Sequence, residues 1–160
     1  MVCSHCSSEI EERFLFCPWC GEVIDKNTRD TKLIQAKWPR RTPNADFKRA
    51  RAIYQVWHDQ LYFPKYPNLE EYGKKEVGLK TAHVYNYRVI GEKFVDDDYN
   101  LRFIGNGDWT IGQVNELKRV TLSQVNSLIA ENIIDDSMGC VQIRKAIQDY
   151  FPSTYGKKRL

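Results

Sequence analysis

The sequence has no apolar run long enough to form a membrane-spanning helix, so we expect no membrane segment. Its first residues, MVCSHCSSEI, lack the basic start and apolar stretch of a secretion signal. This predicts a protein that works in the cytosol of its cell or host. Internal repeats and low-complexity tracts are also missing. With 42% hydrophobic and 28% charged residues, the composition is that of a soluble globular protein and not of a disordered one.

The sequence also lacks the signatures of common enzyme active sites. It contains no G-x-S-x-G, no H-E-x-x-H and no glycine-rich phosphate loop followed by Lys and Ser or Thr. Only three histidines occur, and His58 and Asp59 are neighbours on a predicted helix, where adjacent side chains diverge. We therefore predict a protein that is not an enzyme and that has no small-molecule substrate.

Charge of one sign is not in large excess, but it is unevenly distributed. The net charge is +3, while residues 1–25 carry −4 and residues 26–51 carry +7. A concentrated positive segment attracts phosphates or an acidic protein surface, although a solvated linker is the simpler alternative. The basic candidates for partner binding are Arg40, Arg41, Lys48, Arg49 and Arg51.

What the sequence does contain is a regular cysteine pattern near its start. Four of the five cysteines form two C-x2-C pairs separated by ten residues. Zinc prefers four tetrahedral thiolate or imidazole ligands, and a C-x2-C turn directs two sulfurs at one centre. Two disulfides would require an oxidising compartment, for which there is no signal, and a catalytic zinc would need an open position. The pattern predicts a structural Zn²⁺ held by Cys3, Cys6, Cys17 and Cys20, with His5 as an alternative ligand.

The second pair, in CPWCG, resembles the zinc ribbon family over about residues 1–25. The resemblance implies a small fold of β-hairpins in which the metal replaces a hydrophobic core. This agrees with physical expectation, because so short a segment cannot bury enough apolar surface to fold alone. Trp19, within the second pair, is a candidate for contact with a partner.

The remainder of the sequence predicts helices. After a basic linker over 26–42, a helix is expected to begin with Thr42 as N-cap and Pro43 as first residue. Its predicted apolar face consists of Phe47, Ala50, Tyr54, Trp57 and Leu61, with Lys48, Arg49 and Arg51 largely off that face. Three further helices are expected after residue 107, capped by Asp108 or Thr110, by Thr121 and by Ser137. The last would bury Cys140, Ile143, Ile147 and Tyr150 and end at Pro152, before a basic tail over 152–160.

Between these helices lies a candidate helix-turn-helix unit over residues 68–94. Asn68 is expected to cap a helix over LEEYGKKEV, Gly78 to form a turn, and TAHVYNYRVIGEKF to form the next helix. This order resembles a helix-turn-helix. The matching apolar and turn residues are Tyr72, Val77, Gly78, Leu79, Val84 and Tyr87. The resemblance implies that Lys80, Thr81, His83, Tyr85, Asn86 and Arg88 would face DNA.

One position departs from that family. A small residue usually lies four positions before the turn glycine, where the two helices cross. Here this position is Lys74, and Gly73 comes one residue earlier. Either the first helix is one residue longer, or the helices cross differently.

The predicted architecture is therefore mostly α: a four-cysteine zinc ribbon followed by one helical domain over 43–151. The segments GLKTAHVYNY, QVNELKRV and VQIRKAI look like helix-turn-helix proteins of phages and integrative elements. The whole chain is similar to zinc-containing anti-CRISPR proteins, which implies inhibition of a type II RNA-guided nuclease, or of another nucleic-acid machine, by protein binding. The acidic residues at 9, 11, 12 and 96–98 would suit a basic partner. The alternative is a DNA-binding transcriptional regulator of a mobile element, which would bind duplex DNA.

Overall fold

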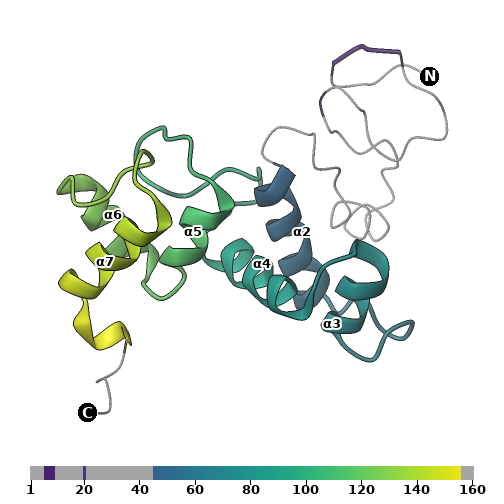
Figure 1. Cartoon of the computed structure of the whole chain (residues 1–160). Coiled ribbons are helices and arrows are strands. Elements are labelled where there is room, and N and C mark those ends of the chain that lie inside the picture. Colours follow the sequence, from purple (N-terminus) through teal and green to yellow (C-terminus); the bar gives the residue numbers. More distant parts are fainter. Residues whose placement is uncertain (1–5, 10–19, 21–44, 156–160) are drawn as a thin grey trace. The chain divides into compact units, whose positions relative to one another are not determined.

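The computed structural model describes residues 6–9, 20 and 45–155. Most of the predicted zinc ribbon, the linker over 26–42 and the end of the basic tail lie outside these residues. The described part is mostly helical and contains no sheet, which confirms the helical class predicted for it. Figure 1 shows its elements. They are α2 (Ala45–His58), α3 (Leu69–Tyr72), the π-helical turn η1 (Gly73–Val77), α4 (Thr81–Phe94), α5 (Ile111–Leu117), α6 (Leu122–Ala130), α7 (Cys140–Tyr150) and the 3₁₀ turn η2 (Pro152–Tyr155).

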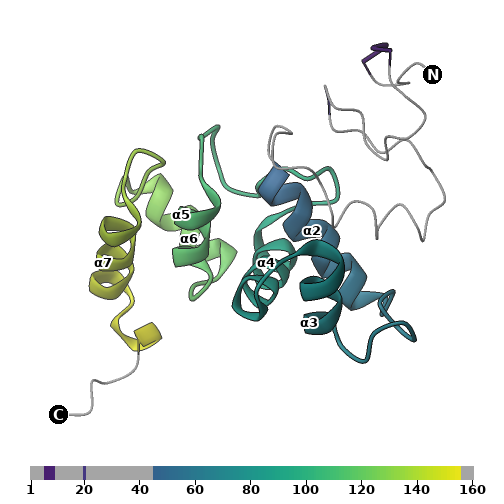
Figure 2. The ribbon, with the colours of Figure 1, turned by 45° about the vertical axis from the view of Figure 1, so that its right-hand side comes forward.

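The chain divides into two compact units between Asn100 and Leu101. The sequence predicted one helical domain over 43–151, and the described helices within this range fall into two groups. The first unit contains α2, α3, η1 and α4, and the second contains α5, α6, α7 and η2. Within the first, α2 and α4 lie side by side in both views (Figures 1 and 2). Among the described helices, none combines the length and the hydropathy that a membrane span requires.

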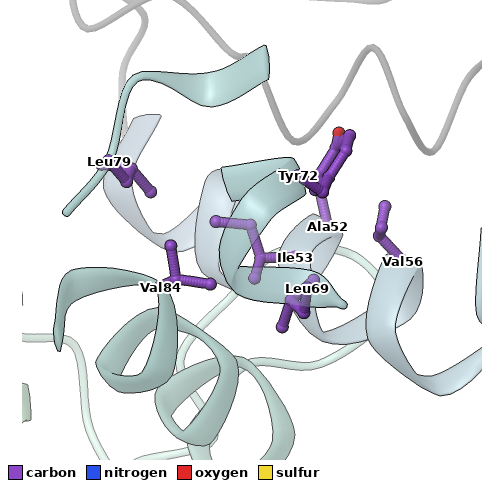
Figure 3. Close-up of a cluster of buried hydrophobic side chains, with 7 residues drawn as sticks. All are labelled: Ala52, Ile53, Val56, Leu69, Tyr72, Leu79 and Val84. Atoms are coloured by element: carbon purple, nitrogen blue, oxygen red, sulfur yellow. The ribbon is translucent and has the colours of Figure 1, made fainter. Parts of the chain in front are cut away.

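The core of the first unit forms where α2, α3 and α4 meet (Figure 3). Its buried members are Ala52, Ile53, Val56, Leu69, Tyr72, Leu79 and Val84. Leu61, Tyr62, Tyr66, Val77 and Tyr87 pack around it and are partly buried. The predicted apolar positions of the helix-turn-helix therefore all belong to this core or its edge, apart from the turn residue Gly78.

The buried face of α2 differs from the predicted one. Phe47 and Ala50 are buried as expected, but Tyr54 is only half-buried and Trp57 is 36% exposed. Ile53 and Val56 fill the core instead. The reason is that α2 packs against both α3 and α4. Its buried face is therefore wider than the single apolar stripe of a helix with one neighbour, and Ile53 lies at its centre. The expected N-cap, Thr42, lies outside the described residues.

Two arginines of α2 were expected to lie off the buried face and are in fact buried. Arg51 donates from Nη1 to the carbonyl oxygen of Gly91 at 3.1 Å and from Nη2 to Oδ1 of Asp97 at 2.6 Å. Arg49 is buried to a similar degree. A guanidinium can be buried when its donors find such acceptors, and these acceptors come from residues 40 and 46 positions away along the chain.

Residues 69–94 form two helical segments joined by a turn, as the sequence predicted. Asn68 caps α3, with its Oδ1 accepting a hydrogen bond from the backbone N–H of Glu71 at 2.9 Å. Gly78 has φ of +75°, the left-handed conformation that glycine adopts without strain. The second helix, α4, spans Thr81–Phe94, the range that the sequence predicted.

The π-helical turn η1 resolves the departure at Lys74. Both Gly78 and Leu79 donate their backbone N–H groups to the carbonyl oxygen of Gly73, so this turn holds one residue more than an α-helical turn. The extra residue places Gly73, and not Lys74, at the crossing with α4. A Cβ atom on Gly73 would lie only 2.3 Å from Cγ2 of Val84. Counted from the crossing residue Gly73 to the turn residue Gly78, the first helix is thus one residue longer than is usual in the helix-turn-helix family. This is one of the two alternatives left open by the sequence.

We predict that Gly73→Ala lowers the free energy of unfolding by about 1–2 kcal/mol, because Val84 must move from its place in the core. In the double variant Gly73→Ala/Val84→Ala the new methyl group enters the space that Val84 leaves. The double variant should therefore be more stable, by about 1 kcal/mol, than the sum of the two single effects implies. Urea unfolding of all four proteins measures this coupling. Simple additivity would mean that the two residues do not meet.

Tyr87 ties α4 to the start of α2. Its hydroxyl donates to Oδ1 of Asp46 at 2.6 Å. Burial and this hydrogen bond raise the pKa of Tyr87 to about 12, because both disfavour the phenolate. The folded state therefore keeps a proton that the unfolded chain has lost above about pH 10.

The contribution of Tyr87 to stability should consequently be constant below about pH 10 and be lost as the pH rises toward 12. Burial also raises the pKa of Tyr72, which adds to the same loss. In Tyr87→Phe the fall should be shallower than in the wild type. Urea unfolding at about pH 9 and about pH 11.5 compares the two proteins, and an equal fall in both would contradict the assignment to Tyr87.

In the second unit, two of the predicted caps are confirmed. Thr110 and Thr121 each accept from the backbone N–H of a glutamine three residues later, at 3.3 and 3.2 Å. The side chains of these glutamines, Gln113 and Gln124, accept in return from the cap N–H groups. Val114, Leu117, Val125 and Leu128 are buried, as the helical periodicity predicted.

The third predicted cap, Ser137, is wrong by two residues. The Ser137 hydroxyl and N–H both bond to Oδ1 of Asp135, so Ser137 stabilises a turn before the helix. Gly139 is the N-cap of α7 instead, with its N–H donating to the side chain of Gln142 at 2.8 Å. Ile143 and Ile147 are buried as predicted, whereas Cys140 is half-buried and Tyr150 is 47% exposed.

Candidate nucleic-acid interface

The N-terminal half of α4 presents most of its predicted partner-binding residues to solvent. Lys80 precedes the helix in an extended conformation, and Lys80, Thr81 and His83 are exposed. Tyr85 is 53% exposed and Asn86 is half-buried. Leu79 and Val84 turn into the core and hold this helix end against α2 and α3. Five of the six predicted residues are thus exposed or half-buried around the N-terminal half of α4, and we call this set the α4 face (Lys80, Thr81, His83, Tyr85 and Asn86).

Arg88, the sixth residue, is held differently. Its guanidinium lies 4.3 Å from the centre of the Trp57 ring and 5.3 Å from that of Tyr85, and its Nη1 lies 3.8 Å from a carboxylate oxygen of Glu92. Cation–π contacts of this kind stabilise an arginine in one position. Arg88 is therefore oriented between two aromatic rings and is not extended into solvent like a phosphate-binding side chain.

Beside these rings the surface is hollowed, with a volume of about 400 Å³. We call this space the aromatic hollow. It is bounded by Trp57, Tyr62, Leu69, Glu70, Val84, Tyr85 and Arg88, together with Asn68. The sequence did not indicate it, because Trp57 was assigned to the buried face of its helix. The available signal was the position of Trp57 in the last turn, just before the proline-containing segment YFPKYPN.

The predicted basic contacts are only partly accessible. Arg49 and Arg51 are buried and Lys48 is half-buried. Arg40, Arg41 and Trp19 lie outside the described residues. Within α2, therefore, the arginines serve the fold, whereas the segment before it, residues 26–44, carries a net charge of +5.

The acidic loop after α4 is also occupied by internal interactions. Oδ1 of Asp96 accepts from the backbone N–H groups of Asp98 and Asn100, both at 2.9 Å. Asp97 pairs with Arg51. Two of the three carboxylates predicted to suit a basic partner thus have structural partners, which weakens the case for an acidic docking face at 96–98.

The predicted metal centre cannot be traced as a whole. Cys3 and Cys17 lie outside the described residues, while Cys6 is exposed and Cys20 is half-buried. Four thiols in two C-x2-C pairs form a donor set that fits zinc and leaves no open position for a catalytic water. Elsewhere in the described ranges, no three His, Cys, Asp or Glu side chains are grouped so as to hold a metal ion.

Comparison with known proteins identified no relative of this chain. No protein family model, no curated protein and no solved structure matches the chain.

Proposed function

We propose that the first unit binds duplex DNA through the α4 face, and that the protein is a zinc-containing, non-enzymatic DNA-binding regulator. The observation that carries this proposal is the crossing of α3–η1 and α4 at Gly73. A small residue at the crossing is what a helix-turn-helix uses to bring its two helices close together, and this supports the proposal. A lysine at the crossing, as Lys74 would have been, is the main structural argument against a DNA-reading helix-turn-helix.

The low net charge of +1 over residues 68–94 fits this role when most phosphate contacts come from elsewhere. Sequence readout uses polar side chains at base edges, whereas phosphate contacts position the protein. Thr81, His83 and Asn86 are of the first kind. The basic segment at 26–44, which directly precedes α2, would supply contacts of the second kind.

Fluorescence anisotropy with a labelled duplex of about 25 base pairs, between about 50 and 200 mM salt, tests the proposal. Binding should weaken steeply as salt rises. Lys80→Ala should reduce the slope of log affinity against log salt by about one. Lys145→Ala, an exposed lysine of α7, is the matched control and should leave the slope unchanged. Absence of binding at about 50 mM salt would refute duplex binding.

A second candidate is inhibition of a type II RNA-guided nuclease by protein binding. The observation in its favour is the exposure of large aromatic side chains, above all Phe63 at 61%, since such residues anchor protein interfaces. It predicts a stable complex with the nuclease on size exclusion and loss of target cleavage, both diminished by Phe63→Ala. Normal cleavage at a large molar excess of the protein would exclude it.

A further inference from the structure

Aromatic rings and guanidinium groups alternate along one edge of the first unit. The Arg51 guanidinium lies 4.8 Å from the centre of the Tyr54 ring, and that ring centre is 6.2 Å from the centre of Trp57. Arg88 follows, between Trp57 and Tyr85. The last three members of this row border the aromatic hollow. The partly exposed rings of Trp57 and Tyr85 are thus held in position by the Arg88 guanidinium before any ligand is bound.

The lining of the hollow combines flat apolar surfaces with a few polar groups. Trp57 and Tyr85 offer rings, and Leu69 and Val84 are buried core residues that form an apolar base. Arg88 supplies hydrogen-bond donors, and the exposed Glu70 supplies carboxylate acceptors. A volume of about 400 Å³ with this mixture is typical of a site for a small planar group and leaves room for an attached sugar.

These features select among possible occupants. A purely apolar side chain of a protein partner would remove water from Arg88 and Glu70 without replacing their hydrogen bonds, which is unfavourable. A carboxylate would be attracted by Arg88 but would also face Glu70 and the Glu92 carboxylate that lies 3.8 Å from Arg88, so the two acidic groups disfavour it. A nucleobase has two π faces for the rings and both donors and acceptors on its edge, so it can stack on Trp57 or Tyr85 and hydrogen-bond with Arg88 and Glu70.

We propose that the aromatic hollow captures an unpaired nucleobase of the nucleic acid bound by the α4 face. The inference rests on the proposed function, because Tyr85 belongs to both surfaces. Extruding a paired base costs a few kcal/mol, and a base that is already unpaired avoids this cost. The protein should therefore prefer a duplex with one bulged nucleotide to the fully paired duplex of the same sequence.

Anisotropy titrations of the two duplexes measure this preference as a ratio of affinities. Stacking of one base predicts that the wild type binds the bulged duplex about tenfold more tightly. Trp57→Leu should bring the ratio close to one. Glu70→Gln, which changes an exposed side chain outside the core, should reduce the ratio of the affinities for the bulged and the fully paired duplex. Lys145→Ala should leave the ratio unchanged.

The outcomes separate the two proposals. Equal binding of both duplexes by the wild type would overturn base capture while leaving duplex binding intact, and the hollow would then be assigned to a protein side chain. Binding of the bulged duplex or of single strands alone would support base capture and overturn duplex reading by the α4 face. A ratio that Trp57→Leu and Glu70→Gln both leave at its wild-type value would also overturn base capture.

Discussion

Gly91→Ala is expected to lower the free energy of unfolding of the first unit by about 3 kcal/mol. A Cβ atom at this position would lie 2.1 Å from the carbonyl oxygen of Ala50 and 2.9 Å from the backbone nitrogen of Arg51. Both atoms belong to the backbone of α2, which cannot rotate aside as a side chain can. The helices would have to separate, and the bond from Arg51 to the carbonyl of Gly91 would lengthen. Hydrogen exchange of the α2 and α4 amides measures this loss in the unit concerned.

The matched control is Gly112→Ala in α5. There the nearest atom to an added Cβ is Sγ of Cys140 at 3.5 Å, which is an ordinary contact. Alanine is the better helix former, so this variant should be unchanged or more stable by about 0.5–1 kcal/mol. If Gly91→Ala retained wild-type exchange protection in α2 and α4, the close crossing of these helices would be wrong.

Removal of zinc is the second change with a large expected effect. The proposed site would contribute about 10–16 kcal/mol of binding free energy to folding of the N-terminal segment. Elemental analysis should find one Zn²⁺ per chain, and Cys17→Ser should abolish it. Chelation should make residues 1–25 susceptible to protease. The circular dichroism signal of α2–α7 should stay nearly constant, because these helices have cores of their own.

Cys140→Ser provides the control for this experiment. Cys140 is the fifth cysteine, half-buried at the start of α7, and is not part of the C-x2-C pattern. Its replacement should leave the zinc content at one per chain. A purified wild-type protein without stoichiometric zinc, whose N-terminal segment is unaffected by chelation, would refute the predicted metal centre.

The local signals in the sequence were sufficient for much of the helical unit. Asn68, Gly78 and the bounds of α4 follow from capping and turn chemistry that acts within four residues. The same holds for Thr110 and Thr121, each of which has a glutamine three residues later to complete the cap. Ser137 is the exception, because the side chain of Asp135, two residues earlier, binds its hydroxyl and its N–H in a turn before the helix.

Features that depend on distant partners were not predictable in this way. The burial of Arg51 requires acceptors on Gly91 and Asp97, and no pattern near Arg51 indicates them. The π-helical turn places Gly73 against Val84 on another helix, a contact that no pattern near Gly73 indicates. The aromatic hollow likewise joins residues of α2, α3 and α4, so its chemistry becomes visible only after the fold has brought them together.

The most direct test of the central claim is selection of binding sites from a pool of random duplex DNA with the full-length protein. If the α4 face reads base edges, successive rounds should enrich a common sequence, and the double variant Thr81→Ala/His83→Ala should lose preference for it while keeping its fold and its non-specific affinity. A pool that remains random after repeated rounds with folded, zinc-loaded protein would show that α4 does not read DNA.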